Sequence, residues 1–170
     1  MLANTLPYSQ LALYYDRVMN HVDYKKWAKF IKIILSHYYQ TPKNIVELAC
    51  GTGAIFKYLK SDKWTLYGGD RSHSMLRIAY EKKRKEPCHF FCADYRNAPI
   101  KKEIFDVALI LYDSVNYIID ETEITWLFEE VNNLLKNGGL FIFDVVSPYI
   151  CKTAFKLSLI HISEPTRLRR

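Results

Sequence analysis

The chain has 170 residues, of which 49% are hydrophobic and 25% charged, and its formal net charge is +6. This length and composition are typical of one soluble globular domain with a sizeable core, and they argue against a disordered or fibrous protein. No apolar run approaches the roughly 18 residues that a membrane-spanning helix needs, and the N-terminus lacks the features of a secretory signal. We therefore expect a cytoplasmic protein without a membrane partner.

The positive charge is not arranged as a track for nucleic acid. Three arginines and one glutamate among the last fourteen residues contribute +2 of the net charge of +6. The remaining excess is spread over lysine-rich segments such as 25–32 and 82–85. Solvated helix faces explain such lysines better than phosphate contacts do, so nucleic-acid binding is not supported.

The four cysteines are Cys50, Cys88, Cys92 and Cys151, and their spacing matches no metal site. Most lie in apolar surroundings. We expect free, buried thiols in a reducing compartment and no bound metal.

Predicted strands and helices alternate along the chain. Asp23 is the expected cap of a first helix, which stops before Thr41-Pro42. The elements expected after it are a strand at 44–49, a helix at 53–60, a strand at 64–69, a helix at 73–85 capped by Ser72, strands at 89–93 and 105–112, a helix at 121–136 capped by Asp120 and ended by Gly138-Gly139, and a strand at 140–146.

Nearly continuous apolar strands separated by helices predict a parallel sheet covered on both faces, which is an open, doubly wound α/β fold. Ligands of such sheets bind beyond the carboxyl ends of the strands. The expected rim carries acids: Asp70, Asp94 and Asp113 each follow a strand, and Glu47 lies within the first. Each aspartate alone can be a simple cap, but together they suit hydroxyls, amino groups and positive charge, and they repel phosphate.

The first strand runs into a glycine loop in the segment IVELACGTGAIFKYL, residues 45–59. A dinucleotide fingerprint needs a small residue where Phe56 stands, and a phosphate-binding loop needs a Lys followed by Ser or Thr. Neither requirement is met, so the loop is not expected to bind a pyrophosphate.

The segment Glu47-Leu48-Ala49-Cys50-Gly51-Thr52-Gly53 instead resembles the signature of class I S-adenosylmethionine-dependent methyltransferases. The resemblance extends from YYDRVM through FDVALILYDSVNYI to LLKNGGLFIFDVV, although Ala49 stands where glycine is common. It implies a Rossmann-like, doubly wound, mostly parallel sheet and S-adenosyl-L-methionine as cofactor.

The resemblance also implies roles for residues. The Gly51–Gly53 backbone would lie against the methionine part of the cofactor, with Glu47 holding its amino group. Asp70 would accept from the ribose hydroxyls, and Asp94, with Tyr95 beside it, from the adenine amino group. The implied cofactor-binding residues further include Ala49, Cys50, Thr52, Arg71, Met75, Tyr112 and Tyr15.

The loop after the fourth strand is where such enzymes touch their acceptor. Asp113, Ser114 and Asn116 are therefore candidate substrate residues, with Asp113 the candidate catalytic base. The alternative is that Asp113 and Asn116 only cap the turn. The N-terminal helices, residues 8–40, can form a lid or substrate segment through Tyr14, Tyr15 and Trp27, although Trp27 fits core packing better.

The expected function is methyl transfer to a small-molecule acceptor. Two alternatives stay open: an RNA or protein methyltransferase, and a non-catalytic module that binds the cofactor or a nucleoside. The loop after the fourth strand has no Asn/Asp-Pro-Pro-aromatic sequence, which argues against methylation of a nucleobase amino group. No motif marks Cys88 or Cys92 as a nucleophile for methylation of a base at C5.

The C-terminal residues 157–167, LSLIHISEPTR, resemble the translation of an adapter used in preparing sequencing libraries. We therefore expect residues 1–156 to form an incomplete methyltransferase domain and residues 157–170 to be a non-native tail. Methyltransferases of this class have seven strands in the order 3-2-1-4-5-7-6. A chain truncated after its fifth strand would leave residues 140–146, LFIFDVV, as an aggregation-prone edge.

Overall fold

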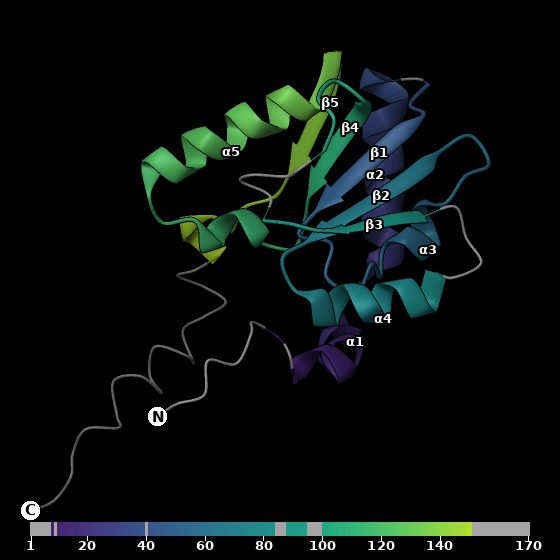
Figure 1. The fold of residues 1–170 in the computed structure, drawn as a ribbon, viewed down its shortest axis with the longest axis vertical. Helices are drawn as coiled ribbons and strands as arrows, with labels where there is room; N and C mark the ends of the chain where they lie inside the picture. Colours follow the sequence, from purple (N-terminus) through teal and green to yellow (C-terminus); the bar gives the residue numbers. More distant parts are fainter. Residues whose placement is uncertain (1–7, 9, 40, 84–87, 95–99, 151–170) are drawn as a thin grey trace, which may run out of the picture.

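A computed structural model describes residues 8, 10–39, 41–83, 88–94 and 100–150. Their centre is a sheet of five parallel strands in the order β3-β2-β1-β4-β5 (Figure 1). The strands are β1 Asn44–Leu48, β2 Thr65–Asp70, β3 Cys88–Cys92, β4 Phe105–Ile110 and β5 Leu135–Phe143. The helices are α1 Tyr15–Val18, α2 Tyr24–Tyr38, α3 Phe56–Leu59, α4 His73–Lys83 and α5 Glu121–Leu134, with 3₁₀ segments at Leu11–Leu13, Met19–His21 and Ser114–Tyr117. The parallel α/β sheet predicted from the sequence is confirmed.

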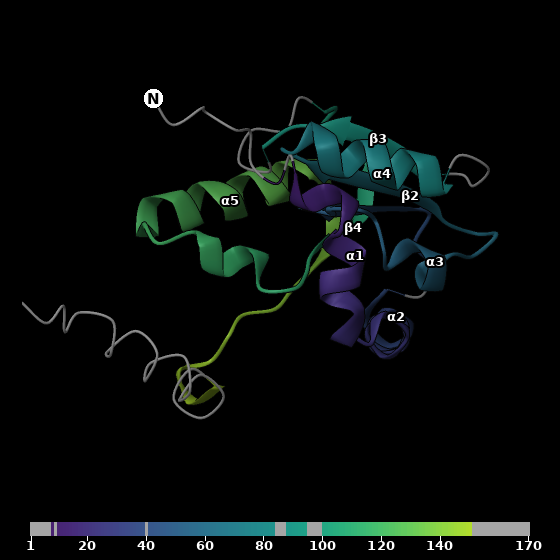
Figure 2. The same cartoon turned by 90° about the horizontal axis from the view of Figure 1, so that it is seen from below.

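The core forms two layers because successive residues of a strand point to opposite faces of the sheet. Ile45 and Val107 pack against α2 and α3 on one face. Val46 and Ala108 pack against α5 on the other. Figure 2 shows α5 well separated from α2 and α3, with the strands between them. Strand β4 is buried along its whole length, as expected for a strand covered on both faces.

The predicted caps of two helices are confirmed. The Asp23 side chain accepts from the Lys26 N–H at 2.9 Å and begins α2. The Asp120 side chain accepts from the Thr122 N–H at 2.7 Å and begins α5. The Ser72 hydroxyl lies 3.4 Å from the Met75 N–H at the start of α4.

Some predicted boundaries were wrong. The helix after the glycine loop begins at Phe56 rather than Gly53, because Gly53 has φ +62°. Helix α5 ends at Leu134 instead of continuing to 136, because Leu135 is extended and pairs with Phe105 of β4.

The fifth strand therefore starts earlier than predicted. After Leu135 the pairing shifts, and regular pairing resumes at Leu140 opposite Val107. In this irregular part of the strand Gly138 has φ +76°, a conformation that glycine adopts without strain. Asp144 and Val146, expected inside the strand, lie beyond its end at Phe143.

The expectation that the cysteines are buried holds only in part. Cys50 is buried, Cys88 is partly buried and Cys92 is exposed, and all three are free thiols. Residue Cys151 and the predicted tail at 157–170 lie outside the described residues. None of the helices in the described part of the chain has the length and apolar character needed to cross a bilayer.

Candidate functional site

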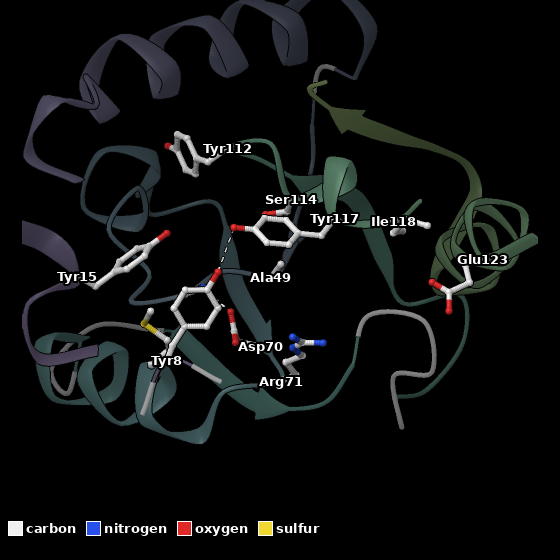
Figure 3. Close-up of a pocket in the computed structure, with 12 residues that line it drawn as sticks. Tyr8, Tyr15, Ala49, Asp70, Arg71, Tyr112, Ser114, Tyr117, Ile118 and Glu123 are labelled. Carbon is white, nitrogen blue, oxygen red and sulfur yellow. Dashed lines mark hydrogen bonds between the residues drawn. The ribbon is translucent and has the colours of Figure 1, made fainter. Parts of the chain in front are cut away.

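A cavity of about 220 Å³ opens at the carboxyl ends of β1, β2 and β4 (Figure 3). This is the edge at which the sequence placed a ligand site. Its lining residues are Tyr8, Tyr15, Ala49, Gly51, Asp70, Arg71, Met75, Tyr112, Ser114, Tyr117, Ile118 and Glu123. A smaller cavity of about 30 Å³ shares Tyr15, Gly51 and Tyr112 with it and has Glu47 in its wall.

The glycine loop brings its backbone to the edge of both cavities. The Cys50 N–H donates to the Gly69 carbonyl at 2.9 Å, which fixes the loop on the end of β2. Gly51 then turns with φ +54°, and a Cβ added there would lie 3.7 Å from the Tyr15 ring. Ala49 has φ +60°, a left-handed conformation that is costly for alanine. This backbone explains why glycine is common at the position of Ala49.

Asp70 joins the ends of two strands. Its Oδ2 accepts from the Gly51 N–H at 2.8 Å, and its Oδ1 accepts from the Ser72 N–H at 2.7 Å. Burial raises the pKa of the Asp70 carboxyl, and the two N–H donors oppose that shift. Asp70 therefore caps the loop before α4 and also lines the cavity, so the two interpretations of this residue are compatible.

Glu47 is a buried carboxyl that the sequence placed inside the first strand. It is 2% exposed, and its Oε2 has no hydrogen-bond partner among the described residues. Burial raises its pKa well above the ordinary value, and the negative charge of Asp70 raises it further. An unpaired buried carboxyl is costly, so this group fits a ligand that brings a cation or a hydrogen-bond donor.

The other predicted cofactor residues divide into two groups. Arg71 and Met75 line the larger cavity, and Cys50 and Thr52 line the smaller one. Gly53 lines neither: a Cβ there would meet Phe90 at 3.5 Å and Ala79 at 3.6 Å, so this glycine serves packing beneath α4. Asp94 lines neither cavity, and Tyr95 lies outside the described residues.

The loop after β4 has an unusual backbone. Tyr112 and Asp113 both adopt φ +60°. Tyr112 packs edge-on against Tyr24 and Trp27, with ring centroids 5.1 and 5.5 Å apart. Ser114 lines both cavities while its hydroxyl donates to the Leu111 carbonyl at 2.8 Å.

Asp113 is exposed and lines neither cavity. It makes no side-chain cap on the 3₁₀ segment that follows, so capping by this carboxyl is not seen. Its N–H donates to Oδ2 of Asp144 at 3.1 Å. Partial burial raises the pKa of Asp113, as does the neighbouring Asp144 carboxylate. The Asn116 side chain instead accepts from the Val146 N–H at 3.1 Å, which gives Asn116 a structural role.

The N-terminal segment contributes aromatic rings to the site. Tyr15 lines both cavities, whereas Tyr14 is 60% exposed and lines neither. Trp27 packs against the core, as its position on the apolar stripe suggested.

The sequence did not indicate Tyr8 or Tyr117. Their hydroxyls meet at 3.2 Å across the larger cavity, and this contact raises the pKa of Tyr8 to about 12 (Figure 3). Tyr117 lies just after the predicted substrate loop, and this position could have marked it as a site residue. The sequence around Tyr8 offered no such indication. Among the described residues, no group of three or more His, Cys, Asp or Glu side chains is placed to hold a metal.

The methyltransferase domain family matches residues 45–139, which is more than half of the chain and includes the glycine loop and the sheet from β1 to β4. The chain belongs to this methyltransferase domain family. A putative methyltransferase of Geobacillus sp. strain WCH70 is 32% identical over 146 residues, covering 85% of this chain and 59% of the relative.

Solved structures agree with this assignment. An S-adenosylmethionine-dependent methyltransferase from Clostridium acetobutylicum is 35% identical with a TM-score of 0.74, covering 87% of this chain and 61% of that one. The sugar N-methyltransferase KedS8 from Streptoalloteichus sp. shares the fold, with 22% identity, a TM-score of 0.72 and coverage of 88% and 58%. The methyltransferase domain described here thus spans about three fifths of the length of its relatives.

Proposed function

We propose that the protein is an S-adenosyl-L-methionine-dependent methyltransferase acting on a small-molecule acceptor. The observation that carries this proposal is the arrangement of Glu47, Gly51 and Asp70 around two adjacent cavities at the strand ends, which share lining residues. A nucleotide site has phosphate-binding groups at these strand ends. This protein instead has two acids and a glycine turn there.

The residues fit the proposed cofactor. The unpaired Glu47 carboxyl matches an amino group, because a buried acid is stabilised by a cationic partner. Asp70 faces the larger cavity and has acceptor capacity beyond its two backbone bonds, which suits ribose hydroxyls. The turn at Gly51 lets the methionine part approach the backbone.

When bound, S-adenosylmethionine supplies an already activated methyl group, so the protein's main task is to position the acceptor in line with it. Tyr15, Tyr112 and Tyr117 surround the cavity with aromatic surface that can exclude water. Ser114 lines both cavities, and its hydroxyl oxygen keeps acceptor capacity beyond the bond that it donates to the Leu111 carbonyl. We propose Asp113 as the group that takes a proton from the acceptor. Its side chain lines neither cavity, but it directly precedes Ser114, which lines both, and its raised pKa is consistent with a base.

The small-molecule class is supported by the size of the larger cavity, about 220 Å³, and by neighbours of the same fold. KedS8 is a sugar N-methyltransferase, and the S-adenosylmethionine-bound CalS10 of Micromonospora echinaspora is an amino pentose methyltransferase. An amine or hydroxyl on a small polar scaffold is therefore the first acceptor class to screen.

A second candidate, RNA methylation, is favoured by one feature of the surface. Lys25, Lys26, Lys29 and Lys32 of α2 lie with Lys57 of α3 along a shallow groove. That groove shares no lining residue with the two cavities, and this separation weakens the RNA interpretation.

Calorimetry with S-adenosylmethionine, followed by transfer of radiolabelled methyl to small amines and alcohols, tests the proposal. We expect cofactor binding and labelling of a small molecule. Labelling of RNA or protein alone would establish an alternative acceptor. Tight cofactor binding by a full-length, folded protein without transfer to any acceptor would point to a non-catalytic module.

A further inference from the structure

Three side chains connect the N-terminal segment to the glycine loop. The Thr52 hydroxyl donates to Oδ1 of Asp16 in α1 at 2.6 Å. Lys82 of α4 forms an ion pair with Oδ2 of the same carboxylate and approaches the Thr52 carbonyl at 3.4 Å. The Asp16–Thr52–Lys82 cluster therefore joins α1, the glycine loop and α4, which are distant in the sequence.

This polar cluster matters because α1 has little else to hold it. The helix is four residues long and contains no buried residue. A helix of that length is not stable alone, and without buried side chains it gains little from packing. Its position therefore depends on polar contacts, on the ring contact of Tyr15 with Tyr8, whose centroids are 6.1 Å apart, and on the preceding 3₁₀ segment, where Ala12 is buried.

The residue next to Asp16 is the one that reaches the site. Tyr15 lines both cavities, and its ring lies 3.7 Å from the position of a Cβ on Gly51. A shift of α1 would move this ring away from the cavity walls. The cluster therefore sets where Tyr15 lies relative to the glycine loop.

We propose that Asp16 is a positioning residue for the cofactor, acting through Thr52 and Lys82 to hold Tyr15 over the cavity. This inference rests on the proposed binding of S-adenosylmethionine. It assigns no chemical step to Asp16, which lines neither cavity.

The three contacts are not equal. The ion pair joins side chains that are 32% and 45% exposed, and exposed pairs contribute little. The Thr52 hydroxyl belongs to a residue that is 1% exposed, and its bond is to a charged group. Hydrogen bonds of that kind are the stronger ones, so the Asp16–Thr52 bond should dominate.

The test measures S-adenosylhomocysteine affinity by calorimetry in Asp16→Asn, Thr52→Val, Thr52→Ser and Lys82→Met, with melting temperature recorded for each. Thr52→Val removes the donor of the charged hydrogen bond and should weaken binding by about tenfold or more. Asp16→Asn removes the charge but keeps an acceptor oxygen, so it should weaken binding by a smaller factor of about fivefold. Lys82→Met should weaken it by about twofold or less. Thr52→Ser keeps the hydroxyl at this cavity-lining position and should therefore lose clearly less affinity than Thr52→Val.

Trypsin gives a readout that does not depend on the ligand. Arg17 lies in exposed α1, so cleavage after it reports how firmly the helix is held. Cleavage should be faster in Thr52→Val than in the parent. Thr52 is remote in sequence from the cleaved bond, whereas Asp16 adjoins it and affects trypsin directly. Asp62→Asn and Arg77→Met serve as controls, because they remove one negative and one positive charge at exposed positions outside the cluster. Both should be cleaved at the same rate as the parent.

Parent-like affinity in Asp16→Asn together with parent-like cleavage in Thr52→Val would overturn the inference, as would a loss that Thr52→Ser shares with Thr52→Val. A parent that binds no S-adenosylhomocysteine would refute the proposed function. The cleavage rates would then still decide whether the cluster holds α1.

Discussion

The Asp70 carboxylate accepts a hydrogen bond from the Gly51 backbone N–H at 2.8 Å and so connects the end of β2 to the glycine loop after β1. Its second oxygen accepts from Ser72 at 2.7 Å. One side chain thus shapes the loop and lines the cavity. Substituting it should affect folding and ligand binding together.

Replacing Asp70 with alanine should weaken S-adenosylmethionine binding by about tenfold or more, because two ribose hydroxyls lose their acceptor. It should also lower the free energy of unfolding by about 1–3 kcal/mol for each backbone N–H left without a partner. Calorimetry and urea denaturation measure the two effects. Asp70→Asn keeps one acceptor oxygen and should lie between alanine and the parent. Unchanged affinity in the alanine variant would remove Asp70 from the site.

NADH is the matched control ligand for that experiment. It should show no comparable binding, because the buried Phe56 occupies the position where a dinucleotide site requires a small residue.

Stability should depend on pH through Glu47. The pKa of Glu47 is higher in the folded protein than in the unfolded chain. The free energy of unfolding is therefore highest below the unfolded-state pKa, and it falls as the pH rises through the folded-state pKa. A glutamine in Glu47→Gln stays neutral at every pH, so the variant should not show this fall. We expect the variant to be more stable than the parent at neutral pH, with the difference shrinking as the pH falls to the ordinary carboxyl range. Its affinity for S-adenosylmethionine should drop, since the amino group loses its carboxylate. A stability difference that is independent of pH would contradict this assignment.

Asp113 should affect turnover more than cofactor binding. We expect Asp113→Asn to lower kcat while leaving cofactor affinity within about threefold, or roughly 0.65 kcal/mol. Asp144→Asn provides a sharper test, because it removes a neighbouring charge that raises the pKa of Asp113. If Asp113 is the base, the acidic limb of the pH–rate profile should move to lower pH in Asp144→Asn. A profile that does not move would argue against that role.

Ala49 offers a stabilising substitution. Its φ of +60° costs about 1 kcal/mol or more in an alanine and almost nothing in glycine, whose larger unfolded-state entropy offsets part of the gain. Ala49→Gly should therefore raise the free energy of unfolding by up to about 1 kcal/mol. The same substitution at Ala28, inside α2, should lower it by about 1 kcal/mol or more. Urea denaturation of both variants checks that the free energy of unfolding rises in the first and falls in the second.

The sheet edge at β5 should promote self-association of the 170-residue chain. This strand ends the described sheet, and Phe143 is 40% exposed beside Phe128 and Phe141. An apolar edge strand is a template for pairing with another chain. We expect sedimentation to show oligomers whose population rises with protein concentration.

Phe143→Lys places a charge on that edge and should reduce the association. Tyr38→Lys alters an apolar side chain that is 76% exposed on α2, away from the edge, and should leave it unchanged. A parent that sediments as a monomer at all concentrations, or a Phe143→Lys variant that associates like the parent, would contradict the role of this edge.

The sequence by itself determined the order of the elements and the edge of the sheet that carries the site. Helical and strand periods, together with the caps Asp23 and Asp120, are local signals. The glycine loop and Asp70 were placed correctly at the strand ends because parallel strands bring those ends together. The boundary between α5 and β5 was misplaced, since the pairing of Leu135 with Phe105 decides it and that partner is distant in the chain.

The tertiary structure alone decided which side chains reach the cavity. Gly51 and Gly53 look equivalent in sequence, yet only Gly51 lines it, while Gly53 packs against Phe90. Asp113 lines neither cavity and Tyr117 does line one, because side-chain direction in a loop follows backbone angles that long-range contacts fix. The bond between Asp16 and Thr52 joins residues 36 positions apart, and no local pattern marks such a pair. It forms because folding brings α1 against the glycine loop.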